Sequence, residues 1–373
     1  MAPYLFLDLF LLELYWVADA STRLDTTSDG VGVSIFMFLY SAYYRRIATQ
    51  KGEQERLIEP YLEVRRQRKK MTSREKKPSV PIEGSDSNSG STSAEEPYIE
   101  AWGHKYHHSG RIFVPFDQKE QDRMEIHHRL FRHCLNGALT ATRIPLNVKN
   151  IVDLGSGTGL WPLEMAARYP QANILGIDIS RIQKTNAVPP NVKYAIDNIE
   201  NPWPTPANSI DFLHCRGLAG GVTDWPALFK QAYEKMKPGG YLEWTEMAIQ
   251  IFDFDNNLGD AEQCPTFLNL WRDLSKRNNI DFTPSPSGPV WLVEAGFENI
   301  AQRTEILPLG DWAQDEKLRT RQILMNKISN EHFDNHCGLL FTKSGWTREQ
   351  FDAVAPTFFS ELYAESKKPY TML

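Results

Sequence analysis

The hydrophobic pattern in the middle of the chain predicts five short strands that alternate with turns and helical segments. Apolar runs of about five residues are typical of strands buried on both faces of a parallel sheet. The runs lie at residues 150–154, 174–178, 192–196, 210–214 and 241–245. Their alternation with helical patterns predicts an α/β fold with a doubly wound, mostly parallel sheet.

The first strand runs directly into a turn that contains three glycines, Gly155, Gly157 and Gly159. Glycine adopts backbone conformations closed to other residues and lets a ligand approach the main chain closely. A helical pattern starts at Trp161, so free N–H groups of its first turn face the same place. The sequence therefore predicts a nucleotide-type cofactor site.

The spacing of the glycines argues against a dinucleotide. The G-x-G-x-x-G fingerprint requires a glycine at position 160, and this chain has Leu160 there. Asp153, the acid near the end of the first strand, would repel a pyrophosphate but suits a ligand with an ammonium and a sulfonium group. An oxidoreductase of the NAD type is thus the disfavoured alternative.

Polar residues follow the next strands at the same edge of the predicted sheet. Asp178 comes nineteen residues after Gly159, a spacing that fits a carboxylate bound to both ribose hydroxyls. Asp197 and Asn198 follow the third strand and can pair with an adenine amino group and ring nitrogen. Arg216 follows the fourth strand.

Taken in order, these pieces resemble a Rossmann-like class I methyltransferase that uses S-adenosylmethionine (SAM). Further segments narrow the resemblance to the fungal LaeA-like methyltransferases, over about residues 104–373. They are Tyr106-His107, Gln121-Asp122-Arg123-Met124, His128-Arg129-Leu130-Phe131, Asp224-Trp225-Pro226 and Lys237-Pro238-Gly239-Gly240. The resemblance implies SAM as cofactor, held by Asp153, Gly155, Gly157, Gly159, Asp178, Asp197, Asn198 and Arg216.

Residues 98–147 precede the first strand and are expected to be mostly helical. In the family such a segment is a lid over the cofactor, which makes Tyr106 a candidate contact to SAM. An ordinary buried tyrosine is the alternative. No catalytic base is assigned; His107 in the lid and Glu246 just past the fifth strand are the candidates.

After the fifth strand, residues 252–289 are too long for a simple connection and are expected to form an insertion. Its aromatic residues suit either an apolar acceptor or plain core packing. A sixth strand is expected at 300–307, and two helices at 314–331 and 348–366. The chain ends at residues 370–373, where a closing seventh strand should begin. We therefore expect that strand to be missing and the sixth to be unpaired.

The first 97 residues form a separate extension before a methyltransferase domain at 98–373. Apolar stretches at 4–17 and 31–44 are shorter than the ~20 residues of a membrane-spanning helix. They pack on the catalytic domain or make peripheral membrane contact. The basic cluster at 65–70 is either a nuclear localisation signal or solvated surface. Residues 79–96 are expected to be a disordered linker.

Overall composition favours a cytoplasmic enzyme, with a nuclear location as the alternative. The net charge of −6 provides no cationic field that would recruit nucleic acid directly. The four cysteines are widely spaced, so reduced thiols are expected rather than disulfides or a metal site. The favoured function is methylation, on oxygen or nitrogen, of a small secondary-metabolite acceptor in a biosynthetic pathway. The alternative is a regulator of metabolite gene expression that acts through a protein partner.

Overall fold

The structure of the protein is a computed structural model that describes residues 97–247, 249–254, 265–363 and 367–373. These residues belong to one compact unit, Ala94–Leu373. The apolar stretches, the basic cluster and the linker lie outside the described residues, so the predictions about them remain predictions. None of the described helices is long and apolar enough to cross a membrane.

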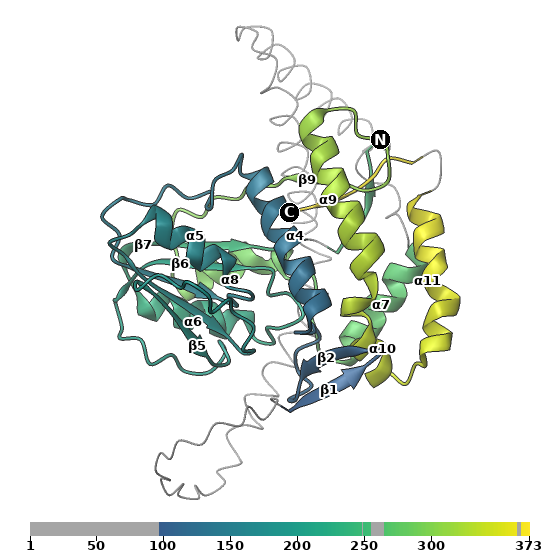
Figure 1. Cartoon of the computed structure of the whole chain (residues 1–373), viewed down its shortest axis with the longest axis horizontal. Coiled ribbons are helices and arrows are strands. Elements are labelled where there is room, and N and C mark those ends of the chain that lie inside the picture. The colour runs from purple at the N-terminus through teal and green to yellow at the C-terminus, as the bar shows by residue number, and fades with distance from the viewer. Residues whose placement is uncertain (1–96, 248, 255–264, 364–366) are drawn as a thin grey trace, which may run out of the picture. The chain divides into compact units, whose positions relative to one another are not determined.

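A five-stranded parallel sheet forms the centre of the domain (Figure 1). Its strand order is β5-β4-β3-β6-β7. The strands are β3 (Asn150–Leu154), β4 (Asn173–Asp178), β5 (Val192–Ile196), β6 (Ile210–Arg216) and β7 (Met236–Thr245). Each pair of adjacent strands in this order is parallel. The predicted fold class is confirmed, and the register places Asp153 of β3 beside His214 of β6.

Helices cover both faces of this sheet. On one face, α5 (Leu160–Arg168) packs Trp161 and Met165 into a cluster with side chains of β3, β4 and β6. On the other face, α6 (Trp225–Lys235) and α8 (Gly288–Ala295) pack on the alternate side chains of the same strands. This two-sided burial is the reason that the strands are apolar runs rather than alternating patterns.

The lid differs from the expectation of a mostly helical segment. It starts with a hairpin of β1 (Tyr98–Ala101) and β2 (His104–His107). Trp102 and Gly103 form the turn with positive φ values of 53° and 79°, the conformation that two-residue hairpins require. Because Trp rarely adopts this conformation, the turn could not be predicted from the residues at these positions. The helical part is α4 (Gln118–Cys134), capped by Asp117.

A second layer of helices and a small sheet complete the domain. Its helices are α7 (Pro265–Arg277), α9 (Glu316–His332), α10 (Gly338–Lys343) and α11 (Arg348–Leu362), with short 3₁₀ turns at Ser285–Ser287 and Phe333–His336. The predicted helices at 314–331 and 348–366 correspond to α9 and α11, whereas α10 was not predicted. Figure 1 shows α4 between the parallel sheet and α9, and α4 contacts both α5 and α9.

The end of the chain corrects one expectation. The sixth strand is shorter than predicted: it is β9 (Ile306–Pro308). It is also paired, because β10 (Pro369–Met372) lies antiparallel between β9 and β8 (Phe252–Asp253). This three-stranded sheet is separate from the parallel sheet, and among the strands of the described residues only β6 pairs with β7.

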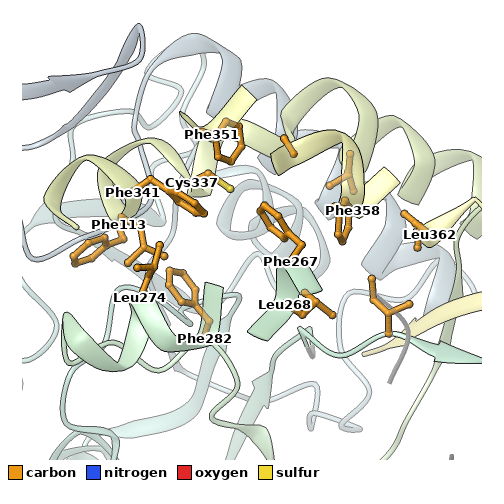
Figure 2. Close-up of a cluster of buried hydrophobic side chains, with 14 of the residues drawn as sticks. Phe113, Phe267, Leu268, Leu274, Phe282, Cys337, Phe341, Phe351, Phe358 and Leu362 are labelled. Carbon is orange, nitrogen blue, oxygen red and sulfur yellow. The ribbon is translucent and has the colours of Figure 1, made fainter. Parts of the chain in front are cut away.

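Two aromatic side chains of the insertion belong to a hydrophobic core. Phe267 of α7 is 2% exposed and contacts the rings of Phe333, Phe341 and Phe358. Figure 2 shows it among side chains of α7, α10 and α11. Trp271 packs against Phe282. Core packing accounts for Phe267 and Trp271, whereas Phe254 is 46% exposed.

Candidate active site

A cleft lies at the carboxyl ends of β3, β4 and β6, where ligands bind in open α/β sheets. The glycine turn after β3 forms its floor, and α4 with the preceding lid residues forms one wall. Six of the predicted cofactor residues line it: Asp153, Gly155, Gly157, Asp178, Asn198 and Arg216. Residues from four separate strand ends thus meet in one place.

The three glycines have different reasons to be glycine. All have positive φ, at 65°, 54° and 79°. A Cβ on Gly155 would overlap the side chain of Leu218, and one on Gly159 would overlap the hydroxyl of Tyr194. A Cβ on Gly157 would meet only Met124 Sδ, at 3.2 Å, within the cleft. Gly157 is therefore the position where a side chain would enter ligand space, whereas Gly159 does not line the cleft.

Asp178 holds the glycine turn in shape. One of its carboxylate oxygens accepts the Gly157 amide at 2.8 Å, and the other accepts the Ser180 amide at 2.9 Å. Burial raises the pKa of this carboxyl to about 6. Each oxygen keeps a lone pair for a further donor. The ribose contact predicted for Asp178 fits this geometry and stays a prediction.

Asp153 is committed to a partner that the sequence did not reveal. Its Oδ1 lies 2.6 Å from Nδ1 of His214, and both side chains are buried in the wall of the cleft. The ring of Trp161 stacks on that imidazole, with centroids 3.9 Å apart. Only the register of β3 and β6 brings these residues together, so no local motif could have indicated His214.

The wall formed by α4 is basic. Arg123, His127 and His128 line the cleft from this helix, and Arg216 of β6 lies 3.0 Å from Nδ1 of His128. Burial and neighbouring arginines lower the pKa of both histidines. Burial likewise lowers the pKa of Arg216 to about 10, so its guanidinium is still charged at neutral pH. Phe131 supports it, with its ring 4.5 Å from that group.

The donor set fits SAM. Acids at the ends of β3 and β4 can accept from an ammonium and from ribose hydroxyls, and the Arg216 guanidinium at the end of β6 can donate to a carboxylate. Arg123 of α4 is already paired with the buried Glu120 at 2.6 Å. The buried hydroxyl of Ser156 in the glycine turn has no hydrogen-bond partner among the described residues. Such an orphaned polar atom is expected where a ligand completes the site.

Tyr106 is not brought to the cleft. It is fully buried, and its hydroxyl donates to the backbone carbonyl of Asn335 at 2.7 Å. A Cβ on Gly338 would approach that hydroxyl to 2.7 Å. The candidate cofactor contact is therefore corrected to the alternative, a buried core tyrosine that joins the lid to the helical layer.

Asp197 and His107 lie in a second hollow beside the cleft, which Asn198 and Ile112 also line. The Asp197 carboxylate is engaged by the Asn198 amide at 2.7 Å and by the Asn201 side chain at 2.9 Å. His107 Nδ1 lies 2.8 Å from the Ser109 hydroxyl. Neither side chain lines the main cleft, so His107 is not placed to act as a base there.

The Glu246 carboxylate is hydrogen-bonded to backbone amides. Its carboxylate accepts hydrogen bonds from the amides of Leu218 (2.8 Å) and Ala219 (3.2 Å) and from the indole of Trp244 (3.0 Å). Burial raises its pKa to about 7. It does not line the cleft, and we correct its role from candidate base to support of the loop after β6.

Comparisons with known proteins agree with this geometry. Residues 126–302 match the family described as "Methyltransferase domain". "Methyltransferase pytC" of Aspergillus terreus is 33% identical over 263 residues, which cover 69% of this chain and 81% of that protein. "Protein-methionine methyltransferase laeA" of Emericella nidulans is 31% identical over 281 residues, 73% of each chain.

The cleft, its acids and glycines, and the likeness to pytC and laeA along most of their length point to one conclusion. The enzyme uses SAM as its cofactor, and the chain belongs to the fungal LaeA-like family of class I SAM-dependent methyltransferases.

Proposed function

We propose that the protein methylates a small, largely apolar secondary metabolite. The observation that carries the proposal is the lining of the cleft opposite the glycine turn. Apolar side chains of the lid and of the loop after β6 enclose this space, and they are Ile112, Val114, Pro115, Phe116, Met124, Phe131, Leu218 and Val222. Burial of an apolar acceptor there would also exclude water from the reacting groups. The likeness to pytC supports methyl transfer as the reaction.

The chain's own residues hold and orient the reactants. When bound, the cofactor supplies a methyl group on a sulfonium, which transfers in line to a nucleophile. Asp178, Ser156 and the Gly157 backbone are placed to hold its nucleoside side, and Arg216 its carboxylate. Orientation and exclusion of water are the main contributions expected of the protein.

A second candidate function is methylation of a protein methionine by a nuclear regulator. The likeness to laeA, which carries that activity in its name, favours it. The basic cluster at residues 65–70 would provide nuclear import, and a regulatory protein partner would then be the acceptor. This candidate requires that an extended peptide, rather than a small molecule, enter the cleft.

One experiment separates the two candidates. The full chain is incubated with methyl-labelled SAM and an extract of the source cells, and small molecules are then separated from protein. Label in the organic phase is expected for the proposed function. Label only on polypeptides would refute it in favour of the regulator. A Gly157→Trp variant serves as the blank, because its side chain would fill the cofactor space.

A further inference from the structure

The side chains of Asp153, His214 and Trp161 contact one another in the cleft, and cofactor binding does not explain this arrangement. His214 of β6 lies beside Asp153 of β3 in the register of the sheet, and its Nδ1 is 2.6 Å from Asp153 Oδ1. The ring of Trp161, at the start of α5, lies parallel to the imidazole, with 3° between the planes and 3.9 Å between centroids. His214 is 2% exposed and lines the cleft.

This arrangement fixes the orientation of the imidazole. A carboxylate accepts hydrogen bonds only, so the bond to Asp153 places the ring proton on Nδ1 and leaves a lone pair on Nε2. Within the described part of the chain, no hydrogen bond engages Nε2. Trp161 is held in turn by a hydrogen bond from its indole to the Leu139 carbonyl at 2.9 Å. The ring is therefore held on one edge and one face, with its other nitrogen unengaged.

Contacts to charged groups distinguish His214 from the other histidines of the cleft. Its ring contacts the Asp153 carboxylate and the Trp161 indole. Arg123 lies 2.7 Å from His127. His128 lies 3.0 Å from Arg216 and 3.1 Å from the Glu164 carboxylate, and burial and Arg216 lower its pKa. Among the described histidines that line the cleft, His214 is the one that contacts a carboxylate and no arginine.

We propose that His214 is the general base of the methyl transfer, that Asp153 is its positioning residue, and that the acceptor is a hydroxyl compound. The proposal rests on the proposed function. The hydroxyl proton moves to His214 Nε2, and a lone pair of the acceptor oxygen forms the bond to the methyl carbon. The electron pair of the broken carbon–sulfur bond stays on sulfur, and the imidazolium afterwards releases its proton to solvent. The arrangement follows the logic of carboxylate–histidine pairs in acyl transfer.

The inference separates acceptor classes. A phenol, enol or alcohol loses a proton when its oxygen is methylated, so a base accelerates the reaction. A methionine thioether has no proton to lose and would be methylated equally well without His214. The presence of the Asp153–His214 pair in the cleft therefore favours a hydroxyl acceptor over a thioether.

The first test needs no turnover. Nitrogen NMR of the imidazole groups in the full chain, with and without S-adenosylhomocysteine, reports which ring nitrogen carries the proton. Comparison with His214→Asn assigns the signal. We expect a proton on Nδ1 and none on Nε2 at pH 7.5. A proton on Nε2 would overturn the proposal, because that nitrogen could not then accept one.

The second test measures rates. Single-turnover transfer from methyl-labelled SAM to the phenolic fraction of a source-cell extract is compared for the wild type, His214→Asn and Asp153→Asn. His133→Asn is the matched control, since His133 lies on the same helix as His128 but outside the cleft and bonds only the Lys317 carbonyl. At pH 7.5 we expect His214→Asn to lose at least ~100-fold in rate, with a SAM dissociation constant within about threefold of the wild type.

The pH profile distinguishes a base from a structural histidine. The wild-type rate should rise with pH and level off once the base has lost its proton. The His214→Asn rate should keep rising with pH. Unchanged rates on small molecules in folded His214→Asn would overturn the inference and leave the proposed function standing. Label only on protein thioethers would refute both. If no fraction takes label, the proposed function fails. The role of His214 as a base is then decided by the NMR measurement of its protonated nitrogen.

Discussion

The carboxylate of Glu246 accepts a hydrogen bond from the backbone amide of Leu218 at 2.8 Å, and the side chain of Leu218 occupies the space above Gly155. A residue after the last strand of the sheet, β7, thus supports a side chain that packs on the glycine turn after β3. The loop after β6 lines the cleft through Gly217, Leu218 and Val222. This relationship makes Glu246 part of the support of the cofactor site without contact to the cofactor.

Replacing Glu246 by glutamine should weaken both folding and SAM binding. The amide group cannot accept from all three N–H donors, so at least one of them stays unpaired. We expect a loss of about 1–3 kcal/mol in the free energy of unfolding, measured by denaturant titration, and weaker SAM binding by calorimetry. Glu234→Gln is the control, because Glu234 is exposed on α6 and should change stability by less than about 0.5 kcal/mol. Equal behaviour of the two variants would contradict this role.

Gly157→Val should lower SAM affinity at least tenfold, a loss of about 1.4 kcal/mol. Its side chain would project into the cleft beside Met124. Gly345→Val is a matched control, since Gly345 also has a positive φ, of 82°, and open space at its Cβ. Both variants carry a similar backbone strain of about 1–3 kcal/mol, but only Gly157→Val should alter binding. Isothermal titration at one temperature measures both.

The affinity for SAM should depend on the ionisation of Asp178. Burial raises the pKa of this carboxyl from 3.8 to about 6. Because the folded-state pKa is above the unfolded value, its contribution to stability is complete below pH 3.8 and is lost as pH rises through about 6. Ligand hydroxyls favour the ionised form, so SAM affinity should increase from pH 5 to pH 7.

A matched pair of variants tests this dependence. Asp178→Asn should bind SAM more weakly and show a flat profile between pH 5 and pH 7, whereas Asp197→Asn should keep the slope, because Asp197 does not line the main cleft. Calorimetric titrations at several pH values supply the data. If only Asp197→Asn lost the pH dependence of SAM affinity, Asp197 rather than Asp178 would control binding.

The contact between the hairpin and α4 should weaken in alkaline solution. His104 lies 2.8 Å from Asp117, the N-cap of α4, and hydrogen bonds to Asp117 and Asp334 raise its pKa from 6.5 to about 9. The stability it contributes is fully present below pH 6.5 and is lost as pH rises through about 9. We expect a decrease of about 1–3 kcal/mol across this window, measured by thermal unfolding. His104→Gln should remove most of this pH dependence; an unchanged profile would refute the assignment.

Truncation of Phe267 tests the assignment of the insertion to the core. Phe267→Ala leaves a cavity among Phe333, Phe341 and Phe358 and should cost about 3–5 kcal/mol. Ile323→Ala is the control on α9, because Ile323 is 62% exposed. In folded Phe267→Ala the acceptor specificity should be unchanged, since its ring does not line the cleft. A change in acceptor preference would instead favour the reading of these aromatics as an acceptor site.

Much of the cofactor site could be predicted, because its strands and its glycine turn depend on residues that are close together in the sequence. The strands at 150–154 and 192–196 have the predicted bounds, since burial on both faces of a parallel sheet requires unbroken apolar runs. The glycine turn was identified because positive φ values leave few alternatives to glycine. The fifth strand begins before the predicted residue 241, because Met236 already pairs with Ile210 as part of β7.

What the sequence determined by itself was the family, the fold class and the floor of the cofactor site, because strand runs, turns and their spacing are set by neighbours along the chain. Only the tertiary structure decided which side chains meet across that floor. Asp153 meets His214 sixty-one residues away, and Tyr106 reaches Asn335 rather than the cleft. Such contacts depend on strand register and on the packing of distant helices, and no local pattern of residues encodes them.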